Sequence, residues 1–189
     1  MALLASACVG RQIPLQPRVE ALAGVSRLPL TVGVYYDPSL HAKKVVTFSV
    51  YEFPIGEASE ALFKQVFSTM FESAPPVPSR PPLPGNPGGL AAVIEPTIED
   101  FKLTEGEGTF VEITYRFSLY APQGTQITSW EVTGTGESHM QSFRELVPTN
   151  LGRATDLAMQ DAARKLATVF SGIPEVREWL RQVGVRVPR

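Results

Sequence analysis

The stretch that decides the fold is Thr109–Ala121, TFVEITYRFSLYA, in which apolar and polar side chains alternate without a break. The apolar set comprises Val111, Ile113, Tyr115, Phe117 and Leu119. Because successive side chains of a strand point to opposite faces, this alternation predicts a strand with one buried and one wetter face. Sheets with one solvated face are commonly antiparallel, so we expect helices to cover the apolar face only.

Two strand-like segments flank this one. LAAVIEPTIEDFKL (90–103) precedes it across the short connection TEGEG (104–108), and its Pro96 predicts a bulge or an edge position. TQITSWEVTGTG (125–136) follows the sequence APQG (121–124), in which proline and glycine suit a type I turn. The three segments are therefore expected to form an antiparallel meander.

The first half of the chain predicts two more strands and a helix. LPLTVGVYY (28–36) and KVVTFSVYEF (44–53) are rich in β-formers and are expected to pair as a hairpin. EASEALFKQVFSTMFES (57–73) repeats apolar residues at helical spacing, which favours a helix whose aromatic face packs in the core over one that exposes it to a partner. The Pro-rich segment 74–89 is predicted to be an exposed connecting loop, with a polyproline ligand as the alternative.

The last part of the chain predicts helices. From about Asn150 an alanine-rich stripe, Ala154, Ala158, Ala162, Leu166 and Val169, recurs at helical spacing, and its small side chains would allow close approach to a sheet. A shorter helix is expected to start at Pro174. The predicted fold class is therefore α+β, with a mainly antiparallel sheet of about five strands and two main helices packed on one face. It occupies a single domain, 28–183, followed by a frayed tail, 184–189.

Composition excludes several classes of function. The 17 basic residues nearly balance the 19 acidic ones, so the chain as a whole has no electrostatic field to attract nucleic acid or an anionic membrane. No stretch approaches the roughly 20 apolar residues that a membrane-spanning helix needs. One cysteine and two distant histidines form neither a disulfide framework nor a zinc ligand set, so we expect no metal and no cofactor.

The single cysteine carries a different signal. LLASAC (3–8) places small residues immediately before Cys8 and apolar ones behind them, and it resembles the lipobox of bacterial lipoproteins. The resemblance implies that residues 1–8 are the remnant of a lipoprotein signal, that Cys8 is lipidated with palmitate-type chains, and that 9–27 are a flexible tether. The alternative is a free cysteine without a role near the N-terminus.

A wider resemblance concerns the folded part. Val93, Ile94 and Ile98, then Leu119 to Gly124, then Trp130 to Gly134 follow a pattern similar to the periplasmic α/β domain of envelope lipoproteins. That group includes the curli-secretion lipoprotein, the activators of peptidoglycan synthases and the N-terminal domain of the Tol-system propeller protein. The resemblance implies a location in the bacterial cell envelope, at the outer membrane facing the periplasm. It implies no catalytic residue.

The residues themselves give no support to catalysis. The chain has no nucleophile elbow, no zinc-protease motif and no phosphate-binding loop with lysine. TGTGES (133–138) is interpreted as a strand end, and the acidic group Glu95, Glu99 and Asp100 as a solvated strand face without a basic partner. We therefore expect that the protein is not an enzyme.

Two hypotheses on function remain open. The first is a non-catalytic lipoprotein, anchored in the outer membrane, that binds an envelope component and assists assembly or transport or modulates a partner. The second is a soluble small-molecule-binding or hydrolytic domain with a pocket between sheet and helices. Aromatic residues dominate binding hot spots, so the predicted partner-binding residues are Tyr35, Tyr36, Tyr51, Tyr120 and Trp130.

Overall fold

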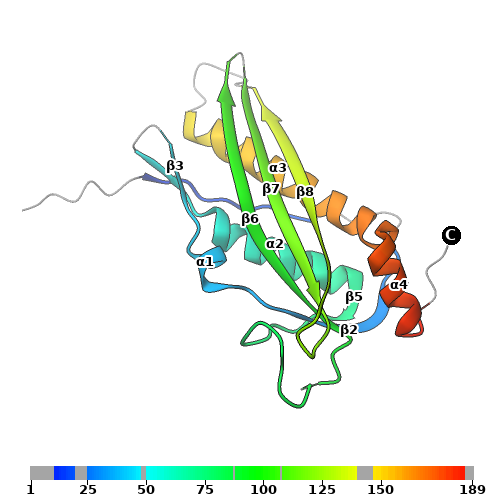
Figure 1. Ribbon diagram of the computed structural model, residues 1–189. Coiled ribbons are helices and arrows are strands. Elements are labelled where there is room, and N and C mark those ends of the chain that lie inside the picture. Colours follow the sequence, from blue (N-terminus) through cyan, green and yellow to red (C-terminus); the bar gives the residue numbers. More distant parts are fainter. Residues whose placement is uncertain are drawn as a thin grey trace, which may run out of the picture.

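The computed structural model describes residues 11–19, 25–47, 50–86, 88–106, 108–139 and 147–185. Its main sheet has the strand order β5-β2-β6-β7-β8, and a smaller sheet has the order β1-β4-β3. The helices α2 (Ile55–Met70) and α3 (Val147–Val169) lie on one side of the long strands β6, β7 and β8 (Figure 1). This two-layer arrangement confirms the predicted α+β class.

The meander predicted from alternation is the centre of the main sheet. β6 (Ala92–Glu105), β7 (Thr109–Tyr120) and β8 (Gln126–Ser138) pair antiparallel, with a bulge between Ile98 and Asp100. All five apolar residues that alternate along β7 have no exposed surface. The turn before β8 is closed by the N–H of Gly124, which donates to the carbonyl oxygen of Ala121 at 2.9 Å.

The predicted hairpin of the first two strands is wrong. β2 (Leu28–Val34) pairs in parallel with β5 (Phe71–Ser73) on one side and with β6 on the other. The segment 44–53 instead contains two short strands, β3 (Val45–Thr47) and β4 (Tyr51–Phe53), which pair antiparallel with each other. The apolar side chains that alternate along β2 pack in the main core, because β2 lies inside the main sheet between β5 and β6.

The N-terminal segment 11–19 packs on the domain, although its composition predicted a tether. β1 (Arg11–Gln12) pairs in parallel with β4, and the side chain of Ile13 is 4% exposed. A Cβ added at Gly152 of α3 would lie 3.2 Å from Ile13, so the segment runs against that helix. Burial of the Ile13 side chain and two backbone hydrogen bonds, from Arg11 to Val50 and from Ile13 to Glu52, hold these residues in place.

Helix α2 fills the centre of the core with aromatic rings. Phe63 makes edge-on contacts with Tyr115 and Phe117 of β7, at centroid distances of 5.0 and 5.2 Å. Phe67 also meets Phe117 edge-on, and it contacts Phe71 at the start of β5. The aromatic stripe of this helix is therefore core, as predicted.

The backbone of helix α3 lies so close to β8 that two positions of the strand have no room for a side chain. A Cβ added at Gly134 would lie 2.1 Å from the carbonyl oxygen of Ala158, and one added at Gly136 would lie 2.1 Å from that of Ala154. The glycines of TGTGES therefore serve close packing of helix on strand. Past α3 come a short 3₁₀ turn, Phe170–Gly172, and α4 (Pro174–Gln182), which begins at proline as predicted. None of the described helices is long and apolar enough to cross a bilayer.

Candidate functional site

The Pro-rich loop packs on the sheet face opposite the helices. Its Val77 N–H donates to the carbonyl oxygen of Val34, and its Leu83 N–H donates to that of Pro122, both at 2.9 Å. The side chain of Leu83 is buried in a small cluster with Leu90 and Val93. The loop is thus fixed to the end of the sheet, whereas the sequence predicted an exposed connector.

The loop delivers an arginine to a buried carboxylate. Arg80 donates a hydrogen bond to Glu95 of β6, whose side chain is only 3% exposed, while the arginine side chain remains 55% exposed. The hydrogen bond that it donates to Glu95 raises the pKa of the Arg80 guanidinium. Arg80 is therefore held at its inner end, and the rest of its guanidinium donors remain at the surface.

This pair corrects the interpretation of the acidic group on β6. Glu95 is not on a solvated face and does have a basic partner, which a distant loop supplies. Glu99 lies 3.6 Å from Arg116, and Asp100 lies 3.2 Å from Lys102, so these two carboxylates are ordinary surface ion pairs. Alternation along the strand gave no sign of the difference, because it is the loop that buries Glu95.

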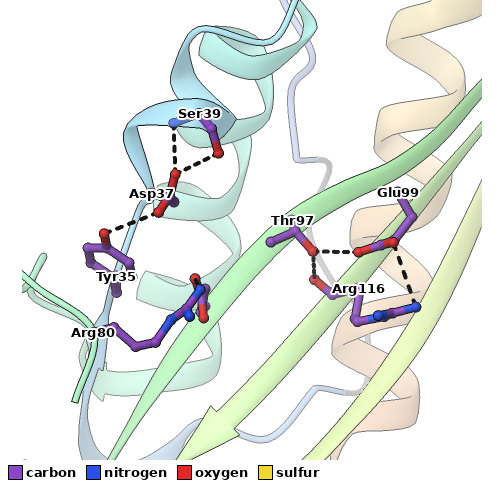
Figure 2. A network of polar contacts seen from close by, with 8 residues as sticks. Tyr35, Asp37, Ser39, Arg80, Thr97, Glu99 and Arg116 are labelled. Carbon is purple, nitrogen blue, oxygen red and sulfur yellow. Dashed lines mark hydrogen bonds and ion pairs between the residues drawn. The ribbon is translucent and has the colours of Figure 1, made fainter. Parts of the chain in front are cut away.

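Asp37 forms a second fixed group beside the pair. It is the N-cap residue of α1 (Pro38–His41) and accepts hydrogen bonds from the N–H and hydroxyl of Ser39 at 2.8 and 2.6 Å. The hydroxyl of Tyr35 donates to the other carboxylate oxygen at 3.2 Å. The bonds from Ser39 lower the pKa of Asp37. Figure 2 shows Tyr35, Asp37 and Ser39 above Arg80.

A separate network lies further along the outer sheet face. Thr97 donates a hydrogen bond to Glu99 at 3.0 Å, and Glu99 lies 3.6 Å from Arg116 (Figure 2). Arg116 also donates a hydrogen bond to Glu131 of β8 at 2.7 Å. The side chain of Arg116 is 46% exposed, and its partners lie at the surface too. Such exposed pairs contribute little to stability. They make this part of the sheet polar and well solvated.

The structure brings together two of the five aromatic residues predicted to bind a partner. Tyr35 continues β2, where its N–H donates to the carbonyl oxygen of Ile94 at 2.9 Å, and Tyr120 pairs with Val93 at the end of β7. Tyr35 also packs against the cluster that contains Leu83, from the loop that carries Arg80, and Val93, the register partner of Tyr120. We call Tyr35, Arg80 and Tyr120 the tyrosine–arginine surface.

The other three aromatic residues lie elsewhere. Tyr36 is covered by Lys64, whose Nζ lies 5.6 Å from the ring centroid, and its hydroxyl is buried. Tyr51 belongs to the small sheet and packs against the second apolar cluster. Trp130 stacks on Phe117 at 5.7 Å and is part of the core.

Sequence reasoning named Glu95 but assigned it no basic partner, and it missed Arg80. The sequence offers one signal for each residue. A single carboxylate lies inside the apolar run AAVIEP (91–96), and a single arginine lies among the prolines of the loop 74–89. A charge in a buried strand requires a partner. The predicted lipidation residue, Cys8, lies outside the described residues. Within the described part, no group of three or more metal-ligating side chains is present.

The sequence matches no family model and no curated protein at a significant level. Among solved structures, a Xanthomonas campestris protein of the family DUF330 is similar, with a TM-score of 0.56 and 9% identity over 87% of this chain and 95% of that one. Its likeness shows a shared fold. A minor lipoprotein from Acinetobacter baumannii gives a TM-score of 0.48 and 10% identity over 78% of this chain and 94% of that one. A Caulobacter crescentus lipoprotein gives 0.41 and 14% over 67% and 83%.

The resemblance to the curli-secretion and Tol-system domains is a finer statement than these comparisons support. It stays a prediction from the motifs around Ile94 and Trp130.

Proposed function

We propose that the protein is a non-catalytic bacterial lipoprotein, anchored in the outer membrane through a lipid on Cys8, that binds another envelope component. The tyrosine–arginine surface is the contact through which it assists assembly or transport or modulates a partner. The anchor is supported by the small-residue run before Cys8. Multiple acyl chains on one cysteine give stable anchoring where a single chain does not.

The observation that carries the binding role is the ordering of Arg80. Tyrosine and arginine are enriched among the residues that dominate protein interfaces. A free arginine loses side-chain entropy when it binds, at a cost of about 0.5–1.5 kcal/mol for a flexible side chain. Here Glu95 holds the guanidinium before any partner arrives, and the loop's backbone bonds to Val34 and Pro122 hold its backbone. The surface is thus preorganised for a partner that offers hydrogen-bond acceptors.

A soluble ligand-binding or hydrolytic domain is the alternative function. It requires an open pocket between sheet and helices. Around Gly134 and Gly136 that space is occupied, because the backbone of α3 lies directly on β8. The described contacts in this region therefore favour the binding role.

The test has two independent readouts. The gene with its upstream sequence, expressed in a bacterial host with labelled palmitate, should incorporate label that a Cys8→Ala variant lacks. A photo-crosslinking amino acid at Tyr35 or Tyr120 should capture a defined envelope component in intact cells, and Arg80→Ala should abolish that product. The matched control places the crosslinker at Thr168 on α3, where no product is expected. Equal labelling of the wild-type protein and the Cys8→Ala variant would refute the lipid anchor. Equal capture with and without Arg80→Ala would refute the role of the tyrosine–arginine surface.

A further inference from the structure

A groove lies in the helix layer of the protein, between the N-terminal segment 11–19 and the first half of α3. Its volume is about 550 Å³. Arg11 and Ile13 line it from the segment, and Arg153, Asp156 and Leu157 line it from the helix. It joins cationic and apolar side chains in one concave surface.

The one carboxylate of the groove is engaged by the protein itself. Asp156 accepts a hydrogen bond from the backbone N–H of Gln16 at 3.0 Å. Burial raises the pKa of Asp156 to about 6. The carboxylate of Asp156 is thus directed at the segment, and the two arginines of the groove, Arg11 and Arg153, outnumber it.

The rim of the groove continues as a stripe along α3. Arg153, Leu157, Gln160 and Arg164 follow one another at spacings of four, three and four residues, which places them on one helix face. Both arginines are exposed, and Leu157 is 39% exposed although its side chain is large and apolar. No acidic residue occupies this stripe, in a chain whose formal net charge is -2. Two carboxylates flank the stripe on the helix: Asp156 accepts the N–H of Gln16, and Asp161 is paired with Lys165 at 2.7 Å.

We propose that this cationic face, formed by Arg11, Arg153, Leu157, Gln160 and Arg164, lies on the anionic phospholipid headgroups of the membrane in which the protein is anchored. The arginines face lipid phosphates, and Leu157 reaches the apolar boundary beneath them. The occupant follows from charge complementarity and from the position of the anchor. The second argument rests on the proposed function, because it uses the lipid on Cys8.

Covalent geometry limits how far the face can be from that lipid. Cys8 and Arg11 are three residues apart, which spans at most about 11 Å of extended chain. An anchored protein therefore keeps Arg11 near the headgroup layer. The Debye length at physiological salt is about 8 Å, so charges at such a distance still act on the membrane surface.

The test uses the full chain with Cys8→Ser, so that its result does not depend on lipidation. Binding to phosphatidylglycerol vesicles is measured by co-sedimentation at low salt, with phosphatidylcholine vesicles as the uncharged comparison. Each arginine near an anionic surface contributes about fivefold in affinity, so Arg153→Gln with Arg164→Gln should weaken binding about 25-fold. The matched control is Lys43→Gln with Arg177→Gln, which removes the same charge from exposed positions off this face and should leave affinity unchanged.

Each outcome decides the proposal. Loss of binding in the stripe variant and not in the control supports it, as does loss of binding for every variant at about 1 M salt, where the Debye length is about 3 Å. Equal losses in both variants, equal binding to phosphatidylcholine, or no binding to phosphatidylglycerol would overturn it. Binding to polyglutamate with the same dependence on the arginines, without vesicle binding, would assign the face to an acidic protein instead.

Two further comparisons separate folding and anchoring from membrane contact. Arg11→Gln with Arg164→Gln leaves Arg153 in place and should also lose about 25-fold, which covers the case in which Arg153 is needed for folding. A protein that takes up no palmitate but binds the anionic vesicles through these arginines would refute the proposed anchor and keep the membrane face. Palmitate uptake without vesicle binding would do the reverse.

Discussion

The packing of α3 on β8 makes Gly136→Ala the sharpest test of the fold. The added methyl carbon would lie 2.1 Å from the carbonyl oxygen of Ala154 and 2.4 Å from the backbone nitrogen of Ala158. Both are helix backbone atoms, so no side-chain rotation relieves the contact, and α3 must move outward by more than 1 Å relative to ordinary contact distances near 3.4 Å. Overpacking of a core costs about 1–3 kcal/mol and sometimes more. Since two backbone atoms clash here, we expect a loss of about 3 kcal/mol in the free energy of unfolding.

Guanidinium unfolding followed by far-UV circular dichroism measures this loss. For a chain of this size, about 3 kcal/mol corresponds to a fall of about 6–12 °C in Tm. The control is Gly172→Ala, since an added Cβ there meets no atom within 4 Å and should change stability by less than about 0.5 kcal/mol. If Gly136→Ala lost less than about 1 kcal/mol, or no more than the control, the close contact between helix and strand would be refuted.

Three further predictions concern polar groups. Burial raises the pKa of Asp156 to about 6, above its unfolded value, so the stability it contributes is present below pH 4 and is lost as the pH rises through 6. Asp156→Asn should remove that fall and, after allowance for solvent screening of a half-exposed group, stabilise the protein at pH 7 by up to about 1 kcal/mol in urea titrations. Arg80→Ala leaves the Glu95 carboxylate buried without its cation and should cost about 1–3 kcal/mol by the same assay, whereas replacing both residues with apolar ones should recover most of it. Tyr115→Phe removes the buried hydrogen bond to Ser59, 2.9 Å long, and should lower Tm by the equivalent of about 1 kcal/mol.

The parts of the fold that the sequence predicted are those determined by local periodicity. The alternation of β7 and the helical stripe of α2 each require one face to be buried, and each found its core face in the structure. The alanines of α3 correctly indicated a close approach to the sheet. Their partners, Gly134 and Gly136, were interpreted only as a strand end, because a contact between two segments cannot be seen in either segment alone.

The parts that were wrong depend on long-range pairing. Nothing local shows that β2 pairs with β5 and β6, since a strand between two parallel neighbours and a strand in a hairpin can have the same composition. The wrong interpretation of Glu95 as a solvated carboxylate has the same cause. Its burial is caused by residues 74–89 folding back over β6, and a polar residue next to Pro96 has no periodic signature that would distinguish it from a surface carboxylate.

The two-layer fold places the two proposed surfaces on opposite sides of the protein. Arg80 lies against the outer face of the sheet, at the end where the Pro-rich loop crosses it, while the arginine stripe of α3 belongs to the helix layer (Figure 1). Between them stands a core whose contacts are rings and backbone: Phe63 on Tyr115, and α3 directly on Gly134. Because a core packed this closely is hardly compressible, it fixes the orientation of α3 relative to the outer face of the sheet. If α3 lies on the membrane, the tyrosine–arginine surface is directed away from it, toward the side from which a partner would approach. Arg153→Gln with Arg164→Gln should then reduce partner capture through Tyr35 only by releasing this orientation. Capture by the detergent-solubilised protein, where no orientation exists, should then be the same with and without these substitutions.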